Sequence, residues 1–133
     1  YEVPAATRIL WNSEKSDVVS QYFAQSDKLV RFMVNWSQTQ LVNSSLTPLT
    51  SEDISTLQSQ HQAWTKLIPE VETGLSEEAT KLKQQMNSAM NNAVLSMEQY
   101  KKNPDIAYLW QAQSALMEFI VAEKELLTTI AVQ

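Results

Sequence analysis

The chain contains no cysteine, one glycine, four prolines and one histidine in 133 residues. Without cysteine, it has no disulfide, no thiol nucleophile, no cysteine zinc site and no iron–sulfur ligand. A single glycine leaves little material for tight β-turns or for a loop that cradles phosphate. The length is nevertheless sufficient for one domain with an apolar core. These absences favour a helical protein that needs no disulfide or structural metal.

Charged residues are also scarce, at 19% of the chain, and acidic residues outnumber basic ones to give a net charge of −5. This balance argues against a nucleic-acid partner, because surfaces that bind phosphate concentrate Lys and Arg. No apolar run approaches the roughly 20 residues that span a bilayer, so we expect membrane contact only through flanking segments outside this chain. The abundance of uncharged polar residues favours a periplasmic or extracellular location.

The helix-breaking residues fall between amphipathic stretches and divide the chain into four segments. The breakers are Pro4, Pro48, Pro69, Gly74 and Pro104. Between them, apolar residues recur at helical spacing. The predicted helices cover about 5–43, 50–68, 76–102 and 104–131. Because the connections are short, consecutive helices should be antiparallel, which predicts one all-α domain over 1–133, an up-down-up-down four-helix bundle.

Several polar residues stand where helices are expected to begin. Thr50 precedes two carboxylates, and Ser76 does the same, which is typical of a helix N-terminus. Asn103 followed by Pro104 predicts a cap and a first helical residue. Pro69 is expected to end or kink the second helix.

The apolar positions of the last two helices differ in character. The third helix presents small residues and methionines, which favour close helix packing. They are Ala79, Leu82, Met86, Ala89, Ala93, Met97 and Tyr100. The fourth helix carries a broader apolar face. It comprises Ile106, Leu109, Leu116, Ile120, Leu127 and Ile130, widened by Trp110, Met117 and Val121.

The first predicted helix is longer than the last. At about 1.5 Å per residue, the two helices measure about 58 Å and 42 Å, so the first overshoots by about 15 Å. Ile9, Leu10 and Trp11 lie in this overhang, at the end of the bundle that holds both chain ends. Because exposed apolar clusters usually have a partner, we expect a homodimer through the first helix.

No catalytic or metal-binding motif emerges from the sequence. A di-iron bundle needs Glu-x-x-His pairs, but the residue three before His61 is Gln58. A haem held by His61 and one of Met86, Met90 or Met97 is the alternative that we considered, and core packing of these residues is favoured over it. We therefore expect no enzyme activity, no catalytic residue, no metal and no cofactor.

Aromatic residues gather in the half of the bundle remote from the chain ends, which we call the tip. The expected ligand-binding residues there are Arg31, Trp36, His61, Tyr108 and Trp110. Aromatic side chains would supply contact area, and Arg31 would receive an anionic group. The alternative is that these aromatics are ordinary core and rim packing, and it is the favoured one.

In its helix order, its overhang and its aromatic tip, the chain is similar to the extracytoplasmic sensory bundles of bacterial chemoreceptors and sensor kinases. That resemblance covers the whole chain, and it implies a ligand-sensing domain that works in signal transduction. The alternative is a free-standing secreted or periplasmic adaptor, chaperone or immunity protein that binds another protein. Apolar spans in the flanking gene sequence would favour the sensor, whereas a cleavable signal and a stop codon would favour the adaptor.

Overall fold

The computed structural model describes residues 16–42, 49–71 and 76–131. Within these ranges the chain forms four α-helices and no strand. They are α2 (Ser16–Val42), α3 (Ser51–Val71), α4 (Glu77–Lys102) and α5 (Ile106–Ala131). The prediction of an all-α, four-helix architecture is therefore confirmed for the described part of the chain.

The extra length predicted for the first helix cannot be compared with the structure. The described part of α2 has 27 residues, against 26 in each of α4 and α5. The overhang with Ile9, Leu10 and Trp11 lies outside the described residues. Both the overhang and the dimer expected from it stay predictions.

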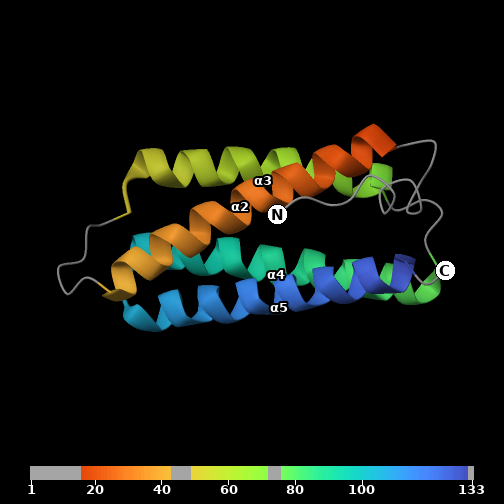
Figure 1. The fold of residues 1–133 in the computed structure, drawn as a ribbon. Helices are drawn as coiled ribbons and strands as arrows, with labels where there is room; N and C mark the ends of the chain where they lie inside the picture. Colours follow the sequence, from red (N-terminus) through yellow and green to blue (C-terminus); the bar gives the residue numbers. More distant parts are fainter. Residues whose placement is uncertain (1–15, 43–48, 72–75, 132–133) are drawn as a thin grey trace.

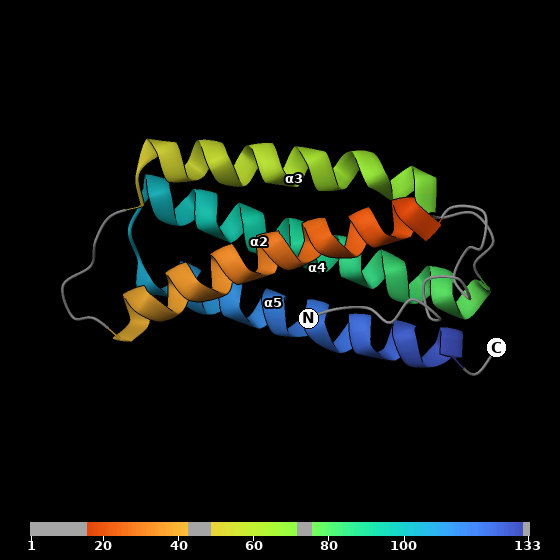
Figure 2. The same cartoon turned by 45° about the horizontal axis from the view of Figure 1, so that its top comes forward.

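The helices pack as neighbours in a closed ring, in which α4 and α5 are the closest pair. The other contacts join α2 to α3, α2 to α5 and α3 to α4. Figures 1 and 2 show that α2 runs obliquely across the bundle: its first turns lie near the end of α3, and its last turns lie near the start of α5. Because of this course, α2 approaches α5 closely only in its second half.

Two of the predicted helix starts are confirmed in detail, and one is corrected. At α3, the Asp53 amide donates to the Thr50 hydroxyl at 3.0 Å, while the Thr50 amide donates to the Asp53 carboxylate at 3.1 Å, which is a reciprocal capping box. At α4, Ser76 accepts a hydrogen bond from the Ala79 amide. At α5, however, the capping residue is Asp105, whose carboxylate accepts from the Ala107 amide at 2.9 Å.

Pro69 was expected to end or kink the second helix, and the predicted end is wrong, because α3 continues to Val71 with Pro69 inside it. The kink stays a prediction. Proline lacks an N–H, so at this position it removes the bond that would reach the Thr65 carbonyl, and its ring crowds that carbonyl. Val71 is fully buried and holds the last turn in the core. The ammonium of Lys83 also donates to the Ile68 carbonyl at 3.2 Å, which satisfies an acceptor near the helix end.

The predicted apolar face of α4 is buried as a whole, so that part of the core is confirmed. The face predicted for α5 is only partly correct. Leu109 and Leu116 are buried, whereas Ile106 and Ile120 are among the exposed apolar residues. Alanines and Phe119 take their place in the core. The buried set is Leu109, Ala112, Ala115, Leu116, Phe119, Ala122 and Leu126.

None of the described helices combines the length and the apolar character needed to cross a membrane.

Candidate functional site

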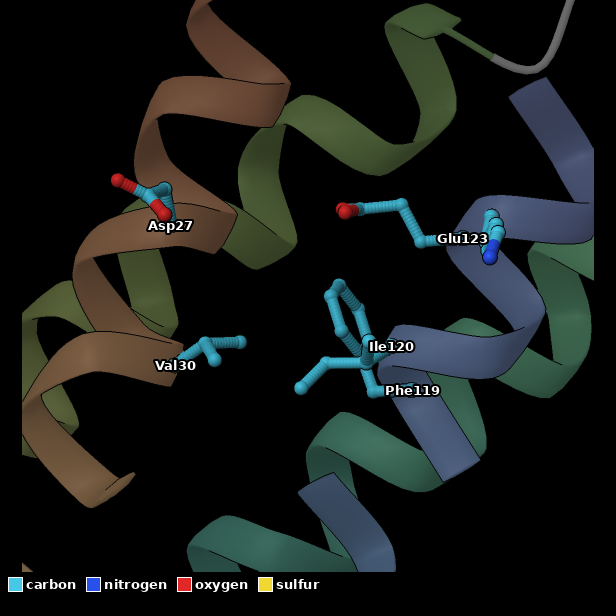
Figure 3. A pocket seen from close by; sticks show the side chains of 6 residues that line it. Asp27, Val30, Phe119, Ile120 and Glu123 are labelled. Carbon is cyan, nitrogen blue, oxygen red and sulfur yellow. The ribbon is translucent and has the colours of Figure 1, made fainter. Parts of the chain in front are cut away.

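A pocket of about 380 Å³ lies between α2 and α5 (Figure 3). The first turns of α2 lie away from α5 (Figure 2). Closer to the start of α5 the two helices are joined, because the Gln113 side-chain amide donates to the Ser37 hydroxyl at 3.0 Å. The pocket residues are Asp27 and Val30 of α2 and Phe119, Ile120, Glu123 and Lys124 of α5.

The floor of this α2–α5 pocket is apolar. Val30 is partly buried, Phe119 is almost fully buried, and Ile120 is exposed. In Figure 3 the side chains of Val30 and Ile120 project toward each other across the space between the helices. A cavity of this size with mostly apolar walls and a few polar groups has the usual composition of a small-molecule site.

Two carboxylates lie above this floor, on opposite walls. Asp27 projects from α2 and Glu123 from α5, and the Glu123 carboxylate points across the pocket toward α2 (Figure 3). Burial, and after it the negative charge of Asp27, raises the pKa of Glu123 to about 7. Glu123 makes no hydrogen bond or ion pair with another described residue. Perturbed titratable groups of this kind are frequent in functional sites.

Arg31 is the only one of the five predicted ligand-binding residues bonded to a pocket residue. Its Nε lies 2.8 Å from the Asp27 carboxylate, one helical turn away, and its side chain is 65% exposed. Arg31 therefore forms an ion pair with Asp27 while most of its own side chain stays in solvent.

The other predicted tip residues lie on different parts of the bundle, and none of the five is among the described residues that line the α2–α5 pocket. Trp36 packs edge-to-face on Tyr100 of α4, with ring centroids 5.1 Å apart. Tyr108 is partly buried, whereas Trp110 is 59% exposed. A ligand role for the tip residues stays a prediction.

His61 is occupied by protein contacts. Its Nε2 lies 2.8 Å from the Asn91 side-chain oxygen, and its ring stacks on Trp64 at 5.9 Å between centroids. The methionines considered as haem ligands are buried in the core. Within the described ranges, no group of three or more His, Asp or Glu side chains could hold a metal ion.

A second feature is an apolar stripe on the solvent side of α5. Ile106, Trp110, Met117 and Val121 are each at least half exposed. They follow one another at spacings of four, seven and four residues, which places them on one face of the helix. Exposed apolar patches of this kind often mark contacts with other molecules.

Sequence analysis does not predict a functional role for Asp27, Val30, Phe119 or Glu123. One signal was available, because Glu123 follows Phe119 by one turn and so lies on an apolar part of α5. The approach of Glu123 to Asp27 depends on the path of α2, which no local pattern specifies.

Comparisons of the chain with protein-family models, with curated proteins and with solved structures gave no match.

Proposed function

We propose that this chain is a ligand-sensing domain of the extracytoplasmic four-helix type of bacterial chemoreceptors and sensor kinases, with a small molecule bound between α2 and α5. The observation that carries the proposal is the α2–α5 pocket, with its apolar floor and its two carboxylates. A ligand there would contact both helices, and it would favour whichever arrangement of α2 against α5 it binds more tightly. That change in packing is the signal that the proposal requires.

The proposal includes an up-down-up-down helix order and a first helix extended over 5–15. It draws support from Figure 1, in which the start of α2 and the end of α5 lie at the same end of the bundle. Membrane segments that flank the domain would then both connect to it at this end of the bundle. Two copies would meet through Ile9, Leu10 and Trp11, and sedimentation of the wild type against Leu10→Glu tests that contact. Equal, strictly monomeric behaviour at high concentration would remove the dimer.

A thermal-shift screen of small molecules with two neighbouring variants tests the pocket. Ile120→Trp should fill the pocket, because Ile120 is a pocket residue, whereas Val121→Trp places the same indole at a half-exposed position outside the α2–α5 pocket. A compound at a hundred times its dissociation constant stabilises a protein by about 2.7 kcal/mol. We expect that stabilisation in the wild type and in Val121→Trp, and its loss in Ile120→Trp. A compound that stabilises all three proteins equally binds elsewhere and counts against the proposal.

The second candidate is a free-standing secreted or periplasmic helical protein that binds another protein. It is favoured by the apolar stripe of α5, since a protein contact would cover Trp110 and Met117. The flanking gene sequence separates the two candidates, because only the sensor requires apolar spans of about 20 residues on both sides.

A further inference from the structure

A groove runs between α4 and α5, which are the closest pair of helices in the bundle (Figures 1 and 2). It contains three hollows of about 500, 400 and 340 Å³, whose described lining residues all belong to these two helices. Neighbouring hollows share Gln85, Ser114 or Glu118, so they form one surface, the α4–α5 groove. Along α5 it extends from Gln111 to Glu125, which is about 21 Å at about 1.5 Å per residue.

The shape of the α4–α5 groove suits a helix. Its lining includes three buried alanines, which leave room for another backbone to approach: Ala89 of α4 and Ala115 and Ala122 of α5. Three larger apolar residues of the groove are at least half exposed. They are Leu95 of α4 and Met117 and Val121 of α5. Apolar side chains of a docked helix would remove them from water, which is the usual mode of helix recognition in a groove.

The charged residues of the α4–α5 groove are mostly acidic. Glu118 lines all three hollows, and Glu125 lines one of them. Both are exposed, and neither forms an ion pair with another residue that the structure describes. Lys81, the cation among the described groove residues, lies 3.9 Å from the carboxylate of Glu77. Glu118 and Glu125 are seven residues apart, so they lie on the same side of α5.

We propose that the α4–α5 groove binds a basic amphipathic helix of another protein. The apolar side chains of that helix cover Leu95, Met117 and Val121, and two Lys or Arg side chains at a seven-residue spacing pair with Glu118 and Glu125. The apolar contact supplies most of the affinity, because exposed ion pairs contribute little, and the charges select the partner.

The charges also disfavour a second copy of this chain as the occupant. The chain has a net charge of −5, and a two-fold contact through this face would bring both carboxylates of each copy into one interface. The α4–α5 groove shares no described residue with the α2–α5 pocket. The inference therefore goes beyond the proposed function and does not depend on it.

Two designed peptides test the proposal by fluorescence anisotropy. Each is an amphipathic helix of about 14 residues, which matches the length of the groove. The apolar residues are leucine in both, and the polar residues are lysine in one peptide and glutamate in the other. We expect the lysine peptide to bind the wild type at least tenfold more tightly than the glutamate peptide does.

Matched charge variants locate the site on the protein. Glu118→Gln combined with Glu125→Gln should weaken binding of the lysine peptide about fivefold. Glu52→Gln combined with Glu98→Gln makes the same change in net charge outside the groove, and it should leave the affinity within about twofold of the wild type.

A second pair of variants tests the apolar contact. Met117→Gln should weaken binding of the lysine peptide at least fivefold. Ile106→Gln is the control, since Ile106 is also about half exposed on α5 but is not a groove residue. Circular dichroism of each variant checks that it is folded.

Four results would overturn the proposal. The lysine peptide fails to bind the wild type, the two peptides bind equally, or Met117→Gln binds the lysine peptide as the wild type does. In the fourth, sedimentation shows self-association that Met117→Gln abolishes, so that the occupant is a second copy. Ile120→Trp, which alters the α2–α5 pocket, should bind the lysine peptide like the wild type. The thermal-shift test of that pocket is therefore independent of this one.

Discussion

The indole N–H of Trp64 donates a 2.7 Å hydrogen bond to the Ser26 hydroxyl, 38 residues away in the sequence. Both residues are fully buried, and the Ser26 hydroxyl in turn donates to the Tyr22 carbonyl at 2.8 Å. The Trp64 ring also stacks on Tyr22, with centroids 5.9 Å apart. This chain of contacts fixes the position of α2 along α3.

Ser26→Ala should therefore destabilise the fold by about 1–3 kcal/mol, because the buried Trp64 N–H loses its acceptor. Ser55→Ala is the control, since Ser55 is exposed on α3. That change should stay within about 0.5 kcal/mol of the wild type. Urea denaturation of the three proteins measures the difference. Equal midpoints would show that the Trp64 N–H is satisfied in another way.

Lys83 links the end of α3 to the core of α4. It is only 1% exposed, donates to the Ile68 carbonyl and lies 5.6 Å from the centre of the Tyr22 ring. Its hydrocarbon stem is buried together with its charge, so packing and hydrogen bonding both depend on this side chain.

Lys83→Met should cost about 1–2 kcal/mol, because it keeps the stem but removes the donor to Ile68. Lys83→Ala should cost about 2–4 kcal/mol, because it also leaves a cavity. Lys81→Met on the exposed side of α4 should be nearly neutral, since its pair with Glu77 is largely exposed to water. Thermal unfolding measures all three. A Lys83→Met protein more stable than the wild type would show that burial of the ammonium costs more than its contacts return.

The success of the sequence predictions differs between the helices for physical reasons. The helix starts at Thr50 and Ser76 depend on local capping, and a local pattern is sufficient to identify them. The apolar face of α4 is narrow, so its periodicity selects the buried residues. The large apolar residues of α5 lie on more than one side of the helix, and periodicity then cannot distinguish the core side, with Phe119, from the solvent side, with Trp110.

The candidate site was harder to predict than the fold. Asp27 and Glu123 belong to helices at opposite ends of the sequence, and their approach depends on the oblique packing of α2. Acidic residues are common on exposed helix faces, so the sequence gives no reason to select these two. The burial of Glu123, which raises its pKa, is a property of the assembled bundle.

The orientation of α5 can be tested with adjacent residues. Leu109 is fully buried and Trp110 is 59% exposed, although the apolar pattern includes both. Leu109→Ala should cost about 2–5 kcal/mol, whereas Trp110→Ala should cost about 0.5 kcal/mol or less in the monomer. Chemical denaturation at low protein concentration makes the comparison. A larger loss for Trp110→Ala would mean that the α5 stripe is covered, either by a second molecule or by another part of the chain.

The pH dependence of stability tests the environment of Glu123. Its pKa is raised from 4.5 to about 7 by burial first and by Asp27 second. Below the lower value the carboxyl group is neutral in both the folded and the unfolded chain. As the pH rises toward 7 the unfolded chain loses this proton and the folded chain keeps it, so the free energy of unfolding falls. Above about 7 that loss is complete.

Glu123→Gln should remove this loss, because glutamine does not ionise. We expect the variant to be more stable than the wild type by about 3 kcal/mol at pH 8, which is the free energy of a shift of this size, and to match it at pH 4. Glu125→Gln should show no such pH-dependent difference, since Glu125 is exposed on the same helix. Thermal melts from pH 4 to pH 8 provide the comparison. Parallel stability curves for the wild type and Glu123→Gln would show that Glu123 ionises normally. Water would then reach its carboxyl group in the α2–α5 pocket.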